Sequence, residues 1–443
     1  MTELAVVLMG ILCGTAAGML PGIGITVTLV LMWPILYTLG ILELILYYMA
    51  LSATVQYTGT IPSVFFGVPG ESNSVPASIE GPKFTRKNLA MLAIGGCQLS
   101  SIIGAIVGAV LTVALLYFLI PYLQYFFNST FKLALYSLVL VFLIFVYNQG
   151  RVFLNLFLIG VGFSLAMPGE SMVENGLRYT FGFYDLSFGI PLLPVLIGFL
   201  VVPTILKNYE TDTSAKLTVN AVSVPASKIF AWLTRNLASV FRGSVLGYFC
   251  GFVPGMGTDL GTNSSYALEK KLHPLNSGKQ LLSAESANNS GVLASWLPLL
   301  LIGIPITSSE VIIYGMLTNA GWNPLEITSV QDTMTNMFLT LSVWYVIINI
   351  IVLIVAWPFA KKVANIITCN YNTLIISTLV VLYFVNSYLG YLDFRFALYQ
   401  ICFFVFCTFG YFLRKHNSMP LIFMFIIALD FEAVLTRVWQ IHF

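Results

Sequence analysis

Four short segments place proline and glycine inside stretches that are otherwise apolar enough for membrane helices. They are LPGIG at 20–24, GVPGESNSV at 67–75, FVPGMGTD at 252–259 and GIPITSSEV at 303–311. Proline removes a backbone hydrogen bond, and glycine loosens the helix around it. Because unpaired backbone is costly in hydrocarbon, such breaks persist where protein or a polar cavity covers them. We therefore expect each segment to interrupt a helix within the membrane.

The four breaks form two pairs that are matched in register. Five positions of the first pair recur at one constant offset: Gly14, Gly18, Pro21, Gly22 and Gly24 return as Gly247, Gly251, Pro254, Gly255 and Gly257. The offset of the second pair is only three residues longer. A single Gly-Pro cluster more often marks a kink or a close helix contact, since small residues let membrane helices pack closely. Two pairs of breaks in matching register favour a binding site over a kink or a packing contact.

The start of a half-helix after a break suits an anion. Its first backbone N–H groups have no partner within the helix, and they lie at the positive end of the helix dipole. We therefore expect a carboxylate substrate, held by N–H, hydroxyl and amide groups rather than by guanidinium groups. The predicted substrate-binding residues are Gly22, Gly24, Thr26, Ser72, Asn73, Gly255, Gly257, Thr258, Asn288, Asn289, Thr307 and Ser308.

Asp259 and Glu310 are the acids predicted to contribute to the binding of a coupling ion, either Na⁺ or H⁺. Acids near membrane depth indicate function by default, and carbonyl groups freed at the breaks would complete such a site. The alternative for both residues is simple solvation at the tip of the break, and for Asp259 it is also an N-terminal helix cap. For Glu285, the alternative to a functional role is a helix cap. No cofactor is predicted, and no metal other than Na⁺.

The composition defines the fold class. Of the 443 residues, 58% are hydrophobic and 9% are charged, whereas soluble domains carry about 25% charged residues. Apolar runs near the roughly 20 residues that a helix needs to cross a bilayer recur along the chain. They lack the alternation of polar and apolar residues that is typical of barrel strands. We predict an all-α polytopic membrane protein.

Basic clusters divide the apolar sequence, and the positive-inside rule places them in the cytoplasm. They lie at 83–87, 151, 207–241, 270–279, 361–362 and 414–415. The segment 207–241 is the longest polar stretch, and we predict a cytoplasmic linker there that includes an interfacial helix. It would separate a first transmembrane repeat at 1–206 from a second at 242–443. The crossings predicted from this spacing are 88–118, 131–147, 152–167, 189–206, 334–357, 372–389, 396–413 and 419–435.

Corresponding loops of the two halves differ in charge. Residues 83–87 are basic, whereas their counterparts at 319–323 carry no charge. Residues 270–279 are basic, whereas their counterparts at 37–46 carry only Glu43. Opposite charge bias in equivalent loops predicts two inverted-topology repeats with broken or re-entrant helices, an architecture typical of secondary transporters.

Other chemistry finds little support in the sequence. The six cysteines are scattered, and no two of them form a CxxC motif. The positions of the three histidines do not indicate a metal site, and the sequence contains no Walker A motif. An intramembrane enzyme is disfavoured, because no HExxH motif, paired catalytic aspartates or nucleophile–base pair can be found. We therefore expect a transporter and not an enzyme.

At the level of motifs, the chain resembles the large membrane subunit of the tripartite tricarboxylate transporters. The resemblance covers nearly the whole chain, and its most specific stretch is ESANNSGVLASWLPLLLIGIP at 285–305. The other matching stretches are LPGIG at 20–24, GTIPSVFFGVPGESNSVPASIEGPKF at 59–84, NGLRYTFGFYDLSFGI at 175–190 and RGSVLGYFCGFVPGMG at 242–257. Asp259 departs from the family pattern, which more often has a small or apolar residue there.

The resemblance implies a permease of the bacterial inner membrane that takes up citrate or a related carboxylate, driven by an ion gradient. It also implies two partners, a small membrane subunit and a periplasmic substrate-binding protein. Two alternatives stay open: a self-sufficient ion-coupled carboxylate carrier, and a sensor or assembly protein that has lost transport. Co-purification of a small membrane protein would distinguish the tripartite permease from the self-sufficient carrier. A substrate-dependent uptake assay would distinguish it from the sensor or assembly protein.

Overall fold

The computed structural model describes residues 2–442 except 21–22, 68–70, 120–121, 123–127, 172, 174–175, 211–221, 255–256, 323–329 and 367–370. Within the described residues the chain is almost entirely helical. The strands found there are β1 (Gly169–Glu170) and β2 (Leu177–Arg178), which form one short antiparallel pair. The predicted all-α class is therefore confirmed. Two predicted site residues, Gly22 and Gly255, lie outside the described residues.

The first half of the chain contains the elements up to residue 210. They are α1 (Glu3–Met19), α2 (Ile25–Leu36), α3 (Ile41–Phe66), η1 (Ser72–Ser74), α4 (Val75–Thr85), α5 (Ala90–Leu119), α7 (Ser129–Val146), η3 (Tyr147–Gly150), α8 (Val152–Ala166), η4 (Tyr184–Phe188), α9 (Leu192–Leu196), the π-helical turn η5 (Ile197–Val201) and α10 (Val202–Glu210).

The second half follows a closely similar order. Its helices are α11 (Ala226–Thr234), α12 (Leu237–Cys250), α13 (Gly257–Leu272), α14 (Ser277–Ile302), α15 (Ser308–Asn319), α16 (Val330–Ile366), α17 (Tyr371–Leu392), α18 (Phe396–Leu413) and α19 (Met419–His442). Helices α10 and α12 extend into both ends of the segment 207–241. Helix α11 lies where the interfacial helix is predicted, and the role of the segment as a domain linker stays a prediction.

All eight predicted crossings coincide with helices. They correspond to α5, α7, α8 and α9–α10 in the first half and to α16–α19 in the second. Five helical segments of the described part are long and apolar enough to cross a membrane: Ala90–Leu119, Ser129–Gly150, Asn336–Val355, Phe396–Leu413 and Met419–Gln440. Several other apolar helices, including α1, α2, α8 and α12, are shorter.

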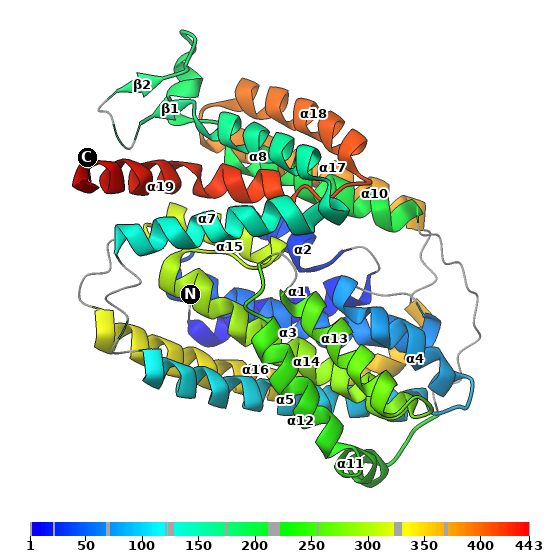
Figure 1. Cartoon of the computed structure of the whole chain (residues 1–443). Coiled ribbons are helices and arrows are strands. Elements are labelled where there is room, and N and C mark those ends of the chain that lie inside the picture. The colour runs from blue at the N-terminus through cyan, green and yellow to red at the C-terminus, as the bar shows by residue number, and fades with distance from the viewer. Residues whose placement is uncertain are drawn as a thin grey trace.

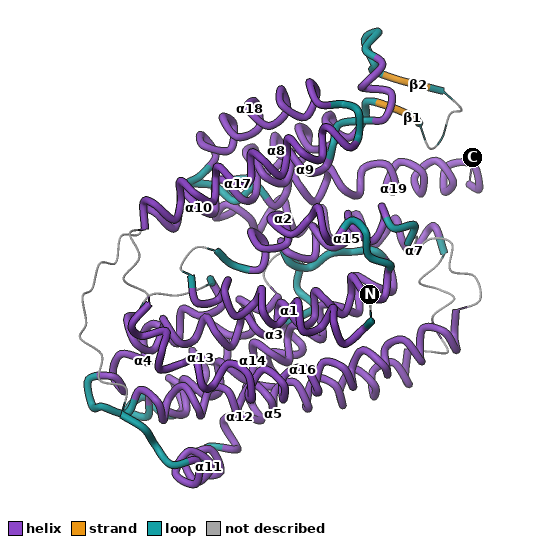
Figure 2. Tube along the Cα trace, turned by 180° about the vertical axis from the view of Figure 1, so that it is seen from behind, coloured by secondary structure: helices purple, strands orange, loops and turns teal. Residues whose placement is uncertain are grey.

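The helices form two layers. Figures 1 and 2 show α1, α3, α5, α12, α13, α14 and α16 in one layer and α7, α8, α10, α17, α18 and α19 in the other. Helices α2 and α15 lie between these layers. The helices that follow the first and fourth breaks are thus sandwiched between the layers, and α2 contacts α15 directly.

Helices α3 and α14 are the most buried elements, and they share the same length, an internal proline and a C-terminal glycine. Each has 26 residues, an internal proline (Pro62 or Pro298) and a C-terminal glycine in the left-handed region. Gly67 has φ 71° and ψ 17°, and Gly303 has φ 71° and ψ 26°. Glycine adopts this conformation without steric cost, which explains its place at both helix ends.

Rows of glycine pack α1 and α12 onto these two central helices. A Cβ added to Gly14 would collide with Thr54 of α3, and one added to Gly247 would collide with the backbone of Ala287 of α14. Gly18 and Gly251 make equally close contacts one turn later. The repeated glycines upstream of the PGxG breaks therefore serve close helix packing.

A helix of each half also packs against the central helix of the other half. Helix α5 packs against α14, whereas α16 packs against α3. Helices α5 and α16 contact each other and run in opposite directions (Figure 1). This arrangement accords with inverted repeats, and a two-fold axis in the membrane plane stays a prediction.

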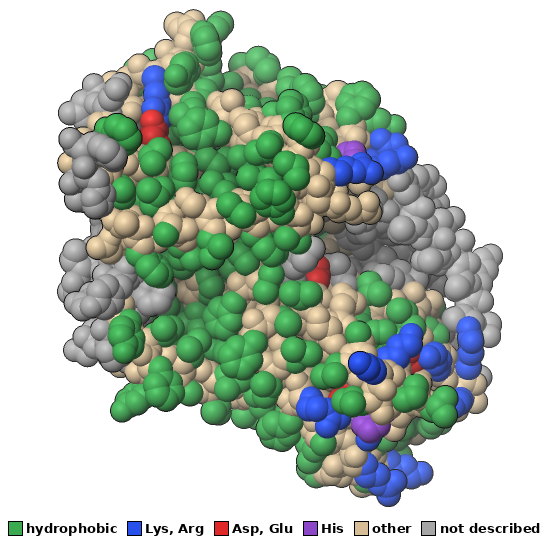
Figure 3. Space-filling view, in the orientation of Figure 1, with side chains coloured by type: hydrophobic (Ala, Val, Ile, Leu, Met, Phe, Trp, Pro, Cys, Tyr) green, Lys and Arg blue, Asp and Glu red, His purple; other side chains and the backbone are tan. Residues whose placement is uncertain are grey.

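Basic side chains gather at one end of the molecule. Figure 3 shows Lys and Arg near α11, at the ends of α4 and α13, and at the end of α18. The β1–β2 hairpin lies at the opposite end (Figure 1). Figure 3 also shows Lys or Arg near the hairpin, so the basic side chains are concentrated on one side without being confined to it, and the assignment of that side to the cytoplasm stays a prediction.

Candidate functional site

At the first break, the start of α2 binds a carboxylate from another part of the chain. Glu71, which lies within the second break, accepts a hydrogen bond from the backbone N–H of Ile25, with Oε1 2.7 Å from the nitrogen. Ile25 is the first residue of α2, so the carboxylate lies at the positive end of the helix dipole. The anion position predicted for a substrate is thus occupied by the chain's own Glu71.

Gly24 makes this contact possible. It is the N-cap of α2, with φ −83° and ψ −169°, an extended conformation open to any residue. A Cβ at this position would collide with Oε1 of Glu71. Gly24 is therefore required for the close approach of a carboxylate and not for a left-handed backbone conformation.

Glu71 belongs to a polar chain that joins the two halves. Its carboxylate is close enough to Asn73 to interact with it, and Nδ2 of Asn73 donates to Oδ1 of Asn288, 3.2 Å away. Asn288 lies on α14 and is almost completely buried. Two residues predicted from separate halves thus meet directly, and they link the start of α2 to the central helix of the second half.

Asp259 is the last residue of the third break and lies in the first turn of α13. It is close enough to Glu71 for their charges to interact, and α13 contacts η1. Thr258 is buried, and its methyl group faces Gly291 of α14. Two acids from different breaks therefore share one polar region, where their like charges repel unless a cation or a proton is bound.

Gly257 packs tightly rather than adopting a special backbone conformation. A Cβ on it would lie 3.0 Å from Cγ2 of Ile306 and 3.1 Å from the carbonyl oxygen of Gly251. The third and fourth breaks therefore touch at this point. The backbone at 257 is held by contacts from both breaks of the second half.

Glu310 caps α15. Its Oε2 accepts from the backbone N–H groups of Ile306 (2.7 Å) and Thr307 (3.1 Å), and its Oε1 accepts from Ser295. Thr307 in turn accepts from the N–H of Glu310, which completes a capping box. Glu310 is 1% exposed, so the alternative of simple solvation is wrong, and its role in ion coupling stays a prediction.

Tyr48 of α3 connects the fourth break with the first half. Its hydroxyl lies 2.9 Å from Oγ of Ser309, and its ring packs on Trp296 with centroids 5.0 Å apart. Ser308, a predicted site residue, is half-buried and faces Sδ of Met419 at 3.8 Å. The sequence does not indicate that Tyr48 or Trp296 lies near the site, because aromatic residues are common in apolar helices.

The remaining predicted residues lie around this core. Thr26 is half-buried in the first turn of α2, and Ser72 begins η1. Asn289 is buried on α14, where its backbone oxygen and Oδ1 accept from the hydroxyl of Tyr345, at 3.1 and 3.3 Å. The site thus draws on α2, η1, α13, α14 and α15.

Two acids were missed or misjudged from the sequence. Glu71 follows Gly70 inside the second break, and this position next to a break was the available signal. Glu285 is not a helix cap: it lies two turns inside α14, is 5% exposed and accepts a hydrogen bond from Thr60 at 3.1 Å. The capping reading of Glu285 is therefore wrong.

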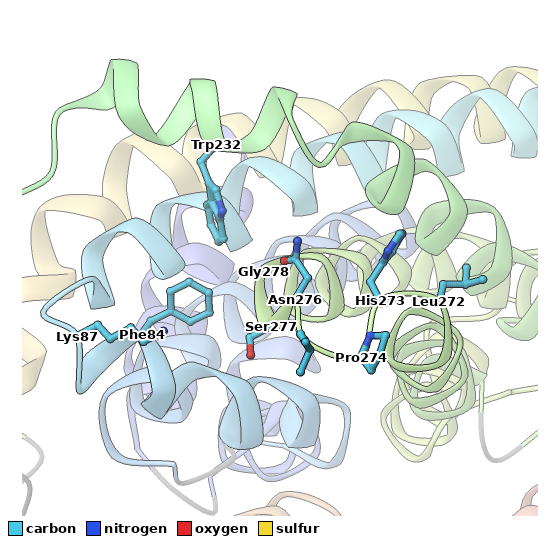
Figure 4. A pocket seen from close by; sticks show the side chains of 10 residues that line it. Phe84, Lys87, Trp232, Leu272, His273, Pro274, Asn276, Ser277 and Gly278 are labelled. Carbon is cyan, nitrogen blue, oxygen red and sulfur yellow. The ribbon is translucent and has the colours of Figure 1, made fainter.

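A separate hollow of about 590 Å³ lies at the basic end of the molecule. Figure 4 shows Phe84, Trp232 and His273 around it, on segments from both halves. None of the predicted substrate-binding residues lines this hollow. It is distinct from the polar cluster at the breaks.

An apolar helical bundle whose interrupted helices converge on a polar cluster defines a class of polytopic membrane proteins that includes the secondary transporters. Comparison with protein families narrows this class. The model of the tripartite tricarboxylate transporter TctA family matches residues 4–425, and the chain belongs to this family.

Two curated relatives are similar over much of the chain. An uncharacterized 52.8 kDa protein in the TAR-I ttuC′ 3′ region of Agrobacterium vitis is 29% identical over 327 residues, covering 71% of this chain and 63% of that protein. An uncharacterized protein of Methanocaldococcus jannaschii is 24% identical over 315 residues, covering 69% and 70%. The matched region thus spans about two thirds of each relative. No solved structure matches the chain.

Proposed function

We propose that this chain is the permease subunit of a tripartite system that takes up a tricarboxylate-like anion across the bacterial inner membrane. A small membrane subunit and a periplasmic binding protein would be its partners, and a Na⁺ or H⁺ gradient would drive uptake. Membership of the TctA family supports the class of substrate and the partner subunits.

The contact between Glu71 and Ile25 is the observation that carries the proposal. It supports a carboxylate-binding position at the start of α2, because a carboxylate is already accommodated there at 2.7 Å. A substrate carboxylate would compete with Glu71 for this position. The hydroxyl and amide groups of Thr258, Asn73 and Asn288 would bind its remaining oxygens.

Asp259 is the acid that we propose for ion coupling. A cation bound beside it would lower the repulsion between the substrate, Asp259 and Glu71, so that each ligand raises the affinity of the other by the same factor. Glu310 is a weaker choice, since its carboxylate is already bound by backbone N–H groups and Ser295.

Binding of labelled citrate and of smaller dicarboxylates to the purified chain, with and without Na⁺ and at several pH values, tests the site. Saturable binding that a second carboxylate displaces supports the proposal. If no carboxylate binds under any of these conditions, the proposed substrate class is wrong.

A further inference from the structure

Three of the nearly buried carboxylates in the described part of the chain have strong partners. Glu80 receives hydrogen bonds from Nζ of Lys83 at 2.8 and 2.7 Å. Glu269, with no exposed surface, forms a salt bridge with Arg242 at 2.6 Å. Glu310 accepts three hydrogen bonds at the start of α15. Each burial is therefore compensated by a cation or by several donors, as buried carboxylates require.

Glu285 is the fourth buried carboxylate, and it lacks such compensation. Within the described residues it accepts one hydrogen bond, from Oγ1 of Thr60 at 3.1 Å. Thr60 lies on α3, so the contact joins the central helices of the two halves. One neutral hydroxyl is far too little to offset the burial of an ionised carboxylate.

The surroundings of Glu285 contain further polar groups without partners. Tyr57 lies about one turn before Thr60 on α3, is 3% exposed, and its hydroxyl has no hydrogen bond within the described residues. Cys97 of α5 is close enough to Glu285 for electrostatic interaction. Ser101, one turn beyond Cys97, is equally buried, and its hydroxyl also lacks a partner in the described part. Buried hydroxyls normally have partners, so the hydroxyl oxygens of Tyr57 and Ser101 are available to bind a further ligand at this junction of α3, α5 and α14.

Glu285 is also placed to influence the breaks. It precedes Asn288 and Asn289 by about one helical turn on the same face of α14. Asn288 accepts from Asn73 beside the second break, and Nδ2 of Asn289 points back to the carbonyl oxygen of Glu285 at 3.5 Å. A change of charge at Glu285 would therefore act one turn away from the site.

We propose that Glu285 binds a monovalent cation, H⁺ or Na⁺, at this junction. In the first case the carboxylate takes up one proton and becomes a neutral carboxylic acid. In the second case the carboxylate and the nearby hydroxyl oxygens hold Na⁺. Either event removes the uncompensated charge. The further claim that this cation drives transport rests on the proposed function. The claim that Glu285 binds a cation does not depend on it.

The helices that contact α14 carry other ionisable groups, which belong in any account of pH dependence. They are Glu43, Tyr47, Tyr48 and Tyr57 on α3, Glu80 and Lys83 on α4, Cys97 and Tyr117 on α5, Arg242, Tyr248 and Cys250 on α12, Asp259, Tyr266, Glu269, Lys270 and Lys271 on α13, and Tyr345 on α16. Lys83 and Arg242 are engaged with Glu80 and Glu269. The variants chosen as tests therefore compare Glu285 with one of these paired acids.

Infrared difference spectroscopy and Na⁺ titration on the purified full-length chain test the proposal. For H⁺, the carbonyl stretch of a protonated carboxylic acid should be present in the native chain and in Glu80→Gln, and absent in Glu285→Gln. For Na⁺, rising NaCl against choline chloride should increase the unfolding temperature of the native chain and of Glu80→Gln, with no increase for Glu285→Gln. One of the two responses is expected.

If Glu285→Gln retains both the infrared band and the Na⁺ response of the native chain, the proposal is overturned. It is equally overturned if the native chain shows neither response. Should the Gln variant fail to fold, Thr60→Val keeps the carboxylate and removes its hydrogen bond, which should shift the apparent cation affinity by about tenfold. An unchanged affinity in Thr60→Val would contradict the proposal. These readouts need no transport, so their failure is separate from failure of the proposed function.

Discussion

Oε1 of Glu71 lies 2.7 Å from the backbone nitrogen of Ile25, so a residue from the second break caps the helix that follows the first. The two breaks of the first half are thereby tied together at one helix start. The same position is the one best suited to a substrate carboxylate. Binding of substrate and release of Glu71 are therefore expected to be linked.

Glu71→Gln should raise the affinity for an anionic substrate roughly two- to fivefold, because it weakens the competing anion and lowers the negative charge near Asp259. The dissociation constant of labelled citrate, measured at low ionic strength, checks this. Glu43→Gln is the matched control, since Glu43 caps the start of α3 through the N–H of Gly40, also at 2.7 Å, but is exposed. Equal affinities in all three proteins would mean that Glu71 is a structural cap alone.

Asp259→Asn should weaken the dependence of carboxylate affinity on the driving cation while the protein still folds. The physical reason is that a neutral amide neither repels the substrate nor attracts the cation, so the coupling between the two ligands falls. Substrate binding titrated at several Na⁺ concentrations and pH values is the measurement. A variant that keeps the native dependence on both ions would show that Asp259 is only an N-terminal cap.

The sequence predicted the fold in its broad lines, because burial in a membrane leaves long apolar runs and charged loops that can be counted. All eight predicted crossings are helices, and the matched breaks lie between helices. Asn73 and Asn288 were also found, since polar groups beside a break stand out in an apolar chain.

What could not be predicted depends on contacts between distant segments. The placement of Glu71 against Ile25 depends on how α3 returns the chain to α2, and the isolation of Glu285 depends on the packing of α3, α5 and α14. Nothing local distinguishes Glu285 from a helix cap, because SAESANN follows a polar loop. Gly24 and Gly257 allow the close approach of neighbouring atoms, whereas Gly67 and Gly303 of the second and fourth breaks have positive φ.

Gly24→Ala should impair uptake beyond any loss of expression and reduce stability by about 1–3 kcal/mol, because the new Cβ would displace the carboxylate of Glu71. Gly257→Ala should have a milder effect, since its Cβ would meet Ile306 and Gly251 at 3.0–3.1 Å. Uptake at equal membrane level and thermal unfolding are the readouts. Gly160→Ala on α8 is the control, since nothing lies within 4 Å of its Cβ. Native behaviour of Gly24→Ala would refute the role of close approach.

The inverted orientation of the halves predicts opposite accessibility of two equivalent loops. Lys87 and Ala320 are both exposed, near the ends of α4 and α15. In a cysteine-free background, an impermeant thiol reagent added to intact cells should label Ala320→Cys and leave Lys87→Cys unlabelled until the membrane is opened. Labelling of both from the same side would exclude inverted repeats.

Uptake into proteoliposomes tests the central claim most directly. The chain is reconstituted with its small membrane subunit, and labelled citrate or a related carboxylate is supplied with the periplasmic binding protein under an inward Na⁺ or proton gradient. We predict accumulation that requires the gradient and the binding protein and is abolished when this chain is left out. Accumulation without a gradient, or none with any carboxylate when all components are present, would contradict the account.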